Sequence, residues 1–364
     1  MKIVILATEP SGDYLGAKLI QELNKKSPQP LIKGIGGELM ENLKFKSWVK
    51  ISEFKAIGIY EVFKNLIRYL NIIKYTEKKI REFTPDIIIT IDSPSFNYRL
   101  LKRLEDLKLN NVKFFHYVAP TVWAWKKYRA KLYAELYDKL FVLFKFERPY
   151  FTKYGLFTKH VGHQIFFEKA KIKKKKYLSF LPGSRLSEIN NNIDKFVSVI
   201  EKSLKKFNEY EFYLLTFKSH QRLIKEKIKK FGSKIKIVTD QKKKQRIMLE
   251  SYLSIAASGS VTLELAKYQT PMIVVYRTHF LTEIIIKLLV KTKYASIINI
   301  YYKKLVVPEL LFNKFKADNV ILHMERLINS KVERFKQINK LKEFSKYMLV
   351  ENKNPSEIVA KYLK

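Results

Sequence analysis

The chain has 364 residues, 47% hydrophobic and 29% charged, so it is long enough for two globular domains and too apolar to be disordered. It contains no cysteine, which excludes disulfides, thiolate metal sites and a cysteine nucleophile and fits a reducing cytoplasm. The formal net charge of +37 indicates a bias toward lysine together with an anionic partner such as a membrane, a substrate or a nucleic acid.

The sequence also disfavours a zinc enzyme and a protein that spans a membrane. The six histidines form no H-x-x-x-H pair, so we expect no zinc site. No apolar run approaches the roughly 18 residues of a membrane span. The apolar run at 2–7 is too short for a signal peptide, and we interpret it as the first strand.

Apolar strands and amphipathic helices alternate through the first half of the chain. We expect strands at 2–7, 31–35, 87–91, 112–118, 140–143 and 157–161, and helices at 14–24, 57–83, 97–107 and 126–137. This alternation predicts a doubly wound parallel sheet in a domain that covers residues 1–167. The lysine-rich run 168–176 predicts an exposed linker.

A second α/β set follows over residues 177–347. We expect its strands at 177–181, 212–217, 235–238, 253–256 and 272–275, and its last helices at 317–328 and 332–347. A final helix within 348–364 is expected to return to the first domain.

The most informative stretch runs from Ile255 to Arg277 and predicts a strand, a tight turn, a helix and a second strand. In the turn, Gly259 permits a positive φ, and Ser258 or Ser260 can cap the helix. The helix N-terminus then lies at the carboxyl edge of a parallel sheet, where phosphates bind. Glu264 could reach a ribose diol there, or it could only complement the helix dipole.

A second turn, Leu181-Pro182-Gly183-Ser184-Arg185, ends the first strand of this set. Ser184 and the backbone amides could contact a phosphate and Arg185 could bind it bidentately, or the turn could be ordinary and Arg185 a surface residue. Taken with Ser258–Ser260, Glu264 and Arg277, the turn predicts a site for a nucleotide diphosphate.

Polar residues also follow the strands of the first domain. Asp92 ends one strand, where its carboxylate could face a cleft or merely cap the next turn. The turn after the first strand carries Glu9, Ser11, Gly12 and Asp13 at the same edge. Three aromatic residues could add stacking and hydrogen-bonding surface, although each taken singly is more often core: His116, Trp123 and Trp125. A dinucleotide fingerprint is weakly supported, because Gly34-Ile35-Gly36-Gly37 lacks a third glycine at the required spacing.

Several motifs occur in a fixed order from end to end. They include S-G-D-Y-L-G-A at 11–17, G-I-G-G at 34–37, I-G-I-Y-E-V at 57–62, P-D-I-I-I-T-I-D-S-P at 85–94, H-Y-V-A-P-T-V-W-A-W at 116–125, V-G-H at 161–163, L-P-G-S-R at 181–185, A-S-G-S-V-T-L-E at 257–264, P-M-I-V-V-Y-R at 271–277, V-K-T-K-Y at 290–294 and P-E-L-L at 308–311. Together they resemble the lipid-A-disaccharide synthase family, and the block at 116–125 is highly specific to it.

The resemblance implies a GT-B-type glycosyltransferase of lipid A biosynthesis, with two Rossmann-like doubly wound domains facing a cleft. The first domain would bind the lipid acceptor and the second the UDP-sugar. The implied reaction is inverting. UDP-2,3-diacylglucosamine donates its sugar to 2,3-diacylglucosamine 1-phosphate (lipid X), giving a β-1,6-linked disaccharide 1-phosphate and UDP. No metal, cofactor or nucleic acid is implied, and a homo-oligomer is left open. The family works in the cytoplasm, on the inner face of the bacterial inner membrane.

The resemblance also implies residue roles. Asp92 would take the proton from the acceptor's 6-hydroxyl, and Arg185 would stabilise the departing UDP. The residues expected to bind the UDP-sugar are Gly183, Ser184, Arg185, Ser258, Gly259, Ser260, Glu264, Arg277 and Glu309. Those expected around the acceptor are Glu9, Ser11, Gly12, Asp13, His116, Trp123 and Trp125.

Three positions depart from the family pattern. Thr8 stands where the family often has glycine, and Ser95 where many members have a second acidic residue. Phe312 stands where glutamine is usual, which leaves a side-chain contact to the nucleotide open there. The alternatives are a UDP-N-acetylglucosamine epimerase or another UDP-sugar transferase of the same fold and, in another class, a basic RNA-binding protein.

Two segments, 59–70 and 280–293, have apolar residues at helical spacing with lysine or arginine opposite. They could simply pack on their sheets. Because a diacylated substrate needs an apolar contact, we expect the first segment to lie on an anionic leaflet, with Val62, Phe63 and Leu66 toward the acyl chains.

Overall fold

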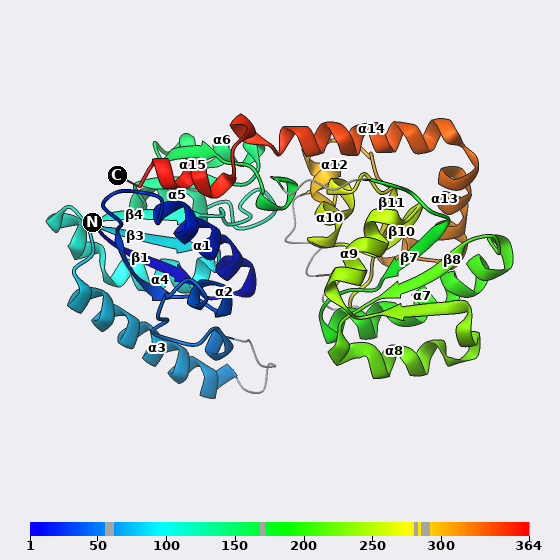
Figure 1. The fold of residues 1–364 in the computed structure, drawn as a ribbon, viewed down its shortest axis with the longest axis horizontal. Helices are drawn as coiled ribbons and strands as arrows, with labels where there is room; N and C mark the ends of the chain where they lie inside the picture. The colour runs from blue at the N-terminus through cyan, green and yellow to red at the C-terminus, as the bar shows by residue number, and fades with distance from the viewer. Residues whose placement is uncertain (55–61, 168–171, 280–282, 285–291, 364) are drawn as a thin grey trace. The chain divides into compact units, whose positions relative to one another are not determined.

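The computed structural model describes residues 1–54, 62–167, 172–279, 283–284 and 292–363 (Figure 1). The chain divides into two compact units. Unit 1 comprises Met1–Phe167 and Met348–Lys364, and unit 2 comprises Glu168–Tyr347. Each unit is built on a six-stranded sheet whose paired strands are all parallel, as the alternation of strands and helices predicts.

The sheet of unit 1 has the strand order β2-β1-β3-β4-β5-β6. Its strands are β1 (Lys2–Ala7), β2 (Leu31–Ile35), β3 (Ile87–Ile91), β4 (Lys113–Tyr117), β5 (Lys139–Val142) and β6 (Phe157–His160). Strand order reverses between β1 and β3. At such a switch point the flanking connections leave toward opposite sides, so a crevice opens at the carboxyl ends of the two strands.

Helices cover the sheet of unit 1. They are α1 (Pro10–Leu23), α2 (Glu38–Glu41), α3 (Val62–Phe83), α4 (Pro94–Arg103), α5 (Arg129–Leu136), α6 (Arg148–Thr152) and α15 (Pro355–Lys361). Val4 and Leu6 of β1 belong to an apolar cluster with residues of α3 and α4, whereas the pleat directs Ile3 and Ile5 to the other face.

Two helices of unit 1 begin earlier than periodicity predicts. α1 starts at Pro10 and α4 at Pro94, because proline at the first helical position is pre-set for helical φ and lacks only an N–H that would have no helical partner. α4 ends at Arg103 and a 3₁₀ turn, Glu105–Asn110, follows it.

The sheet of unit 2 has the order β12-β11-β10-β7-β8-β9. Its strands are β7 (Tyr177–Leu181), β8 (Glu211–Leu215), β9 (Ile235–Val238), β10 (Leu253–Ala257), β11 (Met272–Tyr276) and β12 (Glu309–Leu311). This is the order of a dinucleotide-binding Rossmann sheet, with its switch point between β7 and β10. β12 was not predicted, because three residues are too few to show a period.

Helices of unit 2 connect these strands. They are α7 (Leu186–Lys206), α8 (Gln221–Ile228), α9 (Gln241–Glu250), α10 (Val261–Lys267), α12 (Ile297–Tyr302), α13 (Ala317–Asn329) and α14 (Lys331–Tyr347). α15, which follows unit 2 in the chain, belongs to unit 1. There Lys26 of the α1–β2 connection donates from Nζ to the Ala360 carbonyl at 2.6 Å.

The sequence predicts an exposed linker at 168–176, and in the described part of this run Lys174 is hydrogen-bonded to unit 2. Lys174 donates from Nζ to the carbonyls of Leu249 and Tyr268 at 2.8 and 3.0 Å, and to Oγ1 of Thr270 at 2.5 Å. Burial lowers the pKa of Lys174 to about 7. Lys174 therefore anchors the start of unit 2. The lysine-rich composition of the run does not reveal this role, because it predicts exposed side chains.

Candidate active site

The carboxyl ends of β1 and β3 bring two carboxylates and two hydroxyls together. Asp92 follows β3 and accepts a hydrogen bond from the Ser93 N–H at 2.8 Å. The Ser93 hydroxyl donates to Glu9 Oε1 at 3.0 Å. Burial raises the pKa of Asp92 and the charge of Glu9 raises it further, against the Ser93 N–H and the Ser11 hydroxyl, which favour the ionised form. A carboxylate of raised pKa at a sheet's switch point suits general-base chemistry.

The backbone at Asp92 is strained. Asp92 and Ser93 have φ of 54° and 44°, in the left-handed region, where non-glycine residues cost roughly 1–3 kcal/mol each. Two contacts hold this turn. The Asp92 N–H donates to the Tyr117 carbonyl at 2.9 Å, and Asn97 Nδ2 donates to the Asp92 carbonyl at 2.7 Å. Such strain clusters at functional sites because it aims a side chain that a relaxed turn would direct elsewhere.

The same cluster gives the unusual Thr8 a partner. Its hydroxyl donates to Ser93 Oγ at 2.7 Å, and Ser93 in turn donates to Glu9. The turn after β1 is thus linked to the turn after β3 by side-chain hydrogen bonds. Sequence reasoning missed Ser93, although it directly follows Asp92.

Gly12 lets the start of α1 approach this edge. A Cβ built on Gly12 would lie 3.3 Å from the Ala7 Cβ and 3.5 Å from the Ile91 carbonyl oxygen, so any larger residue would push α1 away from β1 and β3. Gly12 therefore shapes the crevice through packing.

The carboxylate of Asp13, which the sequence analysis places around the acceptor, binds backbone N–H groups at the start of α2. The Asp13 side chain is buried, and it accepts hydrogen bonds from the N–H groups of Gly37, Leu39 and Met40 at 2.8, 3.0 and 3.1 Å. Asp13 thereby caps α2 and joins the S-G-D and G-I-G-G motifs. The capped groups lie at least 24 residues away in sequence, which is why pattern reasoning could not assign this role.

His116, also expected around the acceptor, has its surroundings within unit 1. His116 lies on β4 with 0% of its surface exposed. Its Nδ1 is 2.6 Å from Thr90 Oγ1, and its ring packs against Tyr133 and Tyr137, each with centroids 5.1 Å away. Burial lowers the pKa of His116 to about 3, so it is neutral. In this structure the His116 side chain therefore lies in the core of unit 1.

The two tryptophans of the W-A-W sequence differ. Trp123 is half-buried, and its Nε1 donates to Glu147 Oε1 at 3.3 Å. Trp125 is 39% exposed, with the Lys126 ammonium 4.3 Å from its ring centroid. Of the two tryptophans, Trp125 is therefore the one whose ring is open to solvent.

Glu147, which sequence reasoning missed, holds this loop. Its Oε2 accepts from the Phe144 N–H at 3.0 Å, and burial raises its pKa to about 8. Because the native pKa lies above its ordinary value of 4.5, the stabilisation is complete below pH 4.5 and is lost as pH rises through about 8.

We therefore expect Glu147→Gln to flatten the decline of thermal stability between pH 5 and pH 9. Glutamine does not titrate, so the variant has no group here that must lose a proton as pH rises. Its single amide oxygen can accept only one of the two hydrogen bonds that Glu147 accepts. The check is a series of melting curves against pH, with the exposed Glu135→Gln as control. A decline as steep in Glu147→Gln as in the unmodified chain would show that Glu147 does not titrate in this way.

The crevice of unit 2 lies at the ends of β7 and β10. In the turn after β7, Gly183 has φ of +133°, and a Cβ there would lie 2.9 Å from that of Glu188. The Ser184 and Arg185 N–H groups, expected to meet phosphate, both donate to Glu188 Oε2, at 3.0 and 3.3 Å. Arg185 is 80% exposed and pairs with Glu188 Oε1 at 3.0 Å. A diphosphate would have to compete with Glu188, which lies at the third position of α7, where glutamate typically caps a helix start.

Asn192, also missed, ties this turn to the end of β11. It is fully buried and accepts from the Arg277 N–H at 2.9 Å. Its Nδ2 donates to the Glu188 carbonyl at 2.7 Å and to that of Pro182 at 3.4 Å. Arg277, whose side chain is exposed, is thereby held at the same edge as Arg185.

The Ser258-Gly259-Ser260 turn follows β10, but its conformation differs from expectation. Gly259 is not among the residues with positive φ, and Ser260 does not cap α10 through its side chain. Instead the Thr262 hydroxyl donates to the Gly259 carbonyl at 2.8 Å. A Cβ on Gly259 would meet no atom within 4 Å, so the space in front of this turn is open. Glu264, half-buried, follows in α10.

Glu309, which the sequence analysis assigns to the nucleotide, has three protein partners in this structure. Its carboxylate accepts from the N–H groups of Ala295 and Ser296 at 2.9 and 2.8 Å, and from Asn299 Nδ2 at 2.7 Å. Three protein donors thus occupy it. Glu309 joins the P-E-L-L strand to the start of α12, which no local pattern reveals.

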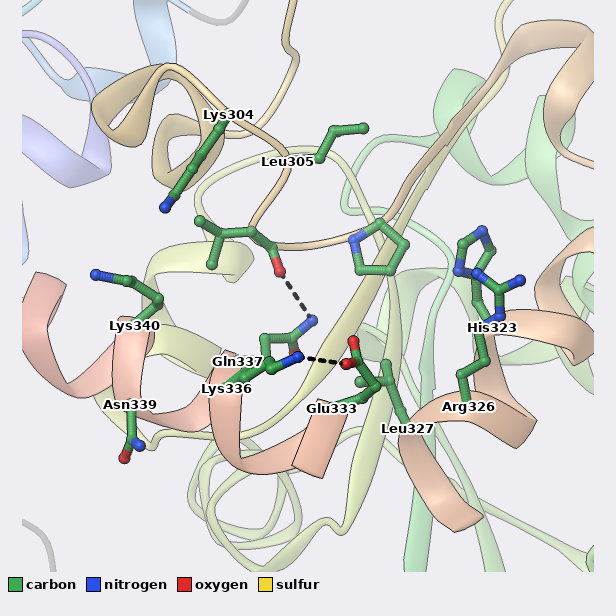
Figure 2. A pocket seen from close by; sticks show the side chains of 12 residues that line it. Lys304, Leu305, His323, Arg326, Leu327, Glu333, Lys336, Gln337, Asn339 and Lys340 are labelled. Carbon is green, nitrogen blue, oxygen red and sulfur yellow. Dashed lines mark hydrogen bonds and ion pairs between the residues drawn. The ribbon is translucent and has the colours of Figure 1, made fainter. Parts of the chain in front are cut away.

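A cavity of about 620 Å³ lies at the opposite edge of this sheet (Figure 2). Gln337 lies within it and donates to the Val306 carbonyl at 3.3 Å, while Lys336 pairs with Glu333 at 2.8 Å. Gln337 also accepts from the N–H of Met272, the first residue of β11, which places the cavity at the amino ends of the strands. Ligands of open α/β sheets bind at the carboxyl ends, so we do not assign the nucleotide to it.

Within the described ranges, no three His, Asp or Glu side chains are grouped as a metal site would require. In the same ranges, no helix is both long enough and apolar enough to cross a membrane. The side chains of Val62, Phe63 and Leu66 lie outside the described residues, as does most of 280–293, so the expected membrane contacts are not seen here.

Solved structures confirm the fold. The UDP-GlcNAc 2-epimerase from Neisseria meningitidis matches with a TM-score of 0.67 over 100% of this chain and 99% of its own, at 14% identity. The glycotransferase of kitacinnamycin matches with a TM-score of 0.64 over 100% and 98%, at 10% identity. Both likenesses confirm the predicted GT-B-type fold and, at such identities, say nothing of activity.

Sequence comparison decides the family. A family model described as lipid-A-disaccharide synthetase matches residues 3–362. The lipid-A-disaccharide synthase of Rickettsia prowazekii is 36% identical over 100% of this chain and 98% of its own length, and that of Hydrogenovibrio crunogenus is 33% identical over 98% and 97%. The chain therefore belongs to the lipid-A-disaccharide synthase family and is a glycosyltransferase of lipid A biosynthesis.

Proposed function

We propose that the enzyme transfers the sugar of UDP-2,3-diacylglucosamine to the 6-hydroxyl of lipid X, with Asp92 as general base. The observation that carries this proposal is the half-buried carboxylate of raised pKa at the β1–β3 switch point. Asp92 takes the hydroxyl proton as O6 attacks the anomeric carbon from the face opposite UDP. The O6–C1 bond forms, the bond from C1 to the diphosphate breaks, and the configuration inverts.

We further propose that unit 1 binds the acceptor and unit 2 the nucleotide. In unit 2, the exposed guanidinium of Arg185 and the open turn at Gly259 flank the β7–β10 switch point. Arg185 would stabilise the charge that grows on the departing UDP, and this requires it to exchange Glu188 for the diphosphate. Glu264 would hold the ribose, and Arg277, at the end of β11, would add a second cation.

The experiment is product analysis with the purified protein, by mass spectrometry for the disaccharide and by NMR for an epimerised sugar, because epimers have equal mass. With UDP-2,3-diacylglucosamine and lipid X we expect a disaccharide 1-phosphate and one UDP per disaccharide. With UDP-N-acetylglucosamine alone we expect no epimerised sugar. Epimerisation without any disaccharide would favour the UDP-GlcNAc 2-epimerase alternative, whose fold this chain shares.

We also propose that the enzyme works in the cytoplasm, bound peripherally to the inner membrane. The net charge of +37 favours an anionic leaflet, and each lysine near such a surface adds about 1 kcal/mol. We expect the protein to co-sediment with anionic liposomes at low salt and to dissociate from them as the salt concentration rises. It should not bind neutral liposomes.

The matched variant replaces Val62, Phe63 and Leu66 by serine. It should bind liposomes less and show a raised KM for lipid X, with UDP affinity unchanged, because only the apolar contact is removed. Normal handling of lipid X by this variant would place the acyl chains elsewhere.

A further inference from the structure

A small cavity of about 180 Å³ lies between α4 and α5 of unit 1. Its walls include Ser95, Tyr98 and Arg99 from α4 and Tyr128, Arg129 and Tyr133 at α5. Pockets that enclose drug-sized ligands measure roughly 300–1,000 Å³, so this one suits a single small group rather than a whole sugar.

The cavity is cationic. Arg99 and Arg129 line it and no aspartate or glutamate does. Among the residues that the structure describes, neither guanidinium pairs with a carboxylate, whereas Arg103 on the same helix binds Glu77 at 2.6 Å. Two uncompensated guanidinium groups at one cavity favour an anion.

Aromatic rings orient both arginines. The Arg99 guanidinium carbon lies 5.9 Å from the Tyr69 ring centroid, and that of Arg129 lies 5.6 Å from the Trp125 centroid. A planar guanidinium held over a ring presents its N–H fork in a fixed direction, which matches the paired oxygens of a phosphate. This also gives Trp125 a role without direct contact to the sugar.

The cavity adjoins the candidate base. Ser95 comes three residues after Asp92 in the chain, and the Tyr133 hydroxyl donates to the Pro94 carbonyl at 3.4 Å. The pKa of Tyr133 is raised mainly by burial; the charge of Asp92 adds to the rise and that of Arg129 opposes it. Both charges therefore act on one hydroxyl.

We propose that this cavity binds the 1-phosphate of the acceptor, with Arg99 and Arg129 as its ligands. The inference rests on the proposed function. In lipid X the phosphate and the 6-hydroxymethyl group are carried by the two ring carbons that flank the ring oxygen, so a phosphate fixed here leaves the 6-hydroxyl a short distance away, toward Asp92. The two arginines thus select a phosphorylated acceptor and choose which hydroxyl reacts.

The test is the ratio of kcat/KM for lipid X to kcat/KM for the same 2,3-diacylglucosamine without its phosphate. We expect Arg99→Gln and Arg129→Gln each to lower this ratio roughly 10- to 100-fold, the scale of a hydrogen bond to a charged group. Arg99→Lys and Arg129→Lys should keep part of the ratio, because lysine keeps the charge and loses the fork. Lys131→Gln, an exposed residue of α5 outside the cavity, should keep all of it.

An unmodified enzyme that uses both acceptors equally well would overturn the assignment. So would arginine variants that lose activity on both acceptors in equal proportion, which is what a merely structural role gives. Failure of the proposed function itself is distinguishable, because then the unmodified enzyme forms no disaccharide from either acceptor.

Discussion

Asp92→Asn is expected to lower turnover of lipid X by roughly 10²–10⁴-fold, the range for removal of a general base. UDP binding should persist, because the change lies in unit 1 and the proposed nucleotide site in unit 2. The fold should also persist, since asparagine tolerates the left-handed φ of 54° and its amide oxygen can accept the Ser93 N–H. Single-turnover kinetics and UDP calorimetry on the purified variant are the measurements.

The same variant should be more stable than the unmodified chain at neutral pH. A native pKa raised above 3.8 means that ionisation of Asp92 opposes folding, so its contribution is most favourable below pH 3.8 and is lost as pH rises through the raised pKa. Asparagine removes that loss and the repulsion from Glu9. Asp86→Asn, at the amino end of the same strand, is the matched control and should leave turnover unchanged. Near-normal turnover in Asp92→Asn would remove Asp92 from the mechanism.

Arg185→Ala is expected to weaken UDP binding and to slow transfer by roughly 10²–10³-fold, the scale for loss of one preorganised donor to a developing anion. Arg185→Lys should recover only part of this, because an ammonium cannot make the bidentate fork. Calorimetry with UDP and steady-state kinetics measure the two effects.

Arg246 of α9 provides the comparison. It is also exposed and also pairs with a glutamate, Glu250, at 3.2 Å. Arg246→Ala should leave both UDP affinity and turnover unchanged. If Arg185→Ala behaves like Arg246→Ala, the diphosphate binds elsewhere in unit 2.

The strands could be predicted from sequence because parallel strands that are buried on both faces appear as continuous apolar runs. Ile87–Ile91 and Met272–Val275 are such runs, and the structure places β3 and β11 there. The place of Asp92 followed from the same logic, since the residue after a strand lies at its carboxyl edge. β12 was not predicted, because a strand of three residues is too short to show a pattern.

The partners of polar groups were harder to predict. Three residues that the sequence analysis assigns to binding sites have protein surroundings that it did not reveal. Asp13 caps a helix more than 20 residues away, Glu309 holds a loop more than 10 residues away, and His116 lies in the core. A sequence pattern shows which edge a residue reaches, but not which donors are already there. Glu188 is a further example. Arg185 pairs with it, so Arg185 must break that ion pair before it can bind a ligand, and the sequence pattern did not show this.

The most direct test of Asp92 as the base is the pH dependence of kcat/KM for lipid X. The unmodified enzyme should lose activity on the acid side with an apparent pKa above 3.8, the ordinary value for aspartate, because burial and Glu9 raise the pKa of Asp92. In Asp92→Asn the residual activity should no longer follow that acid limb. An acid limb that persists unchanged in Asp92→Asn would contradict the account and assign the base to another group.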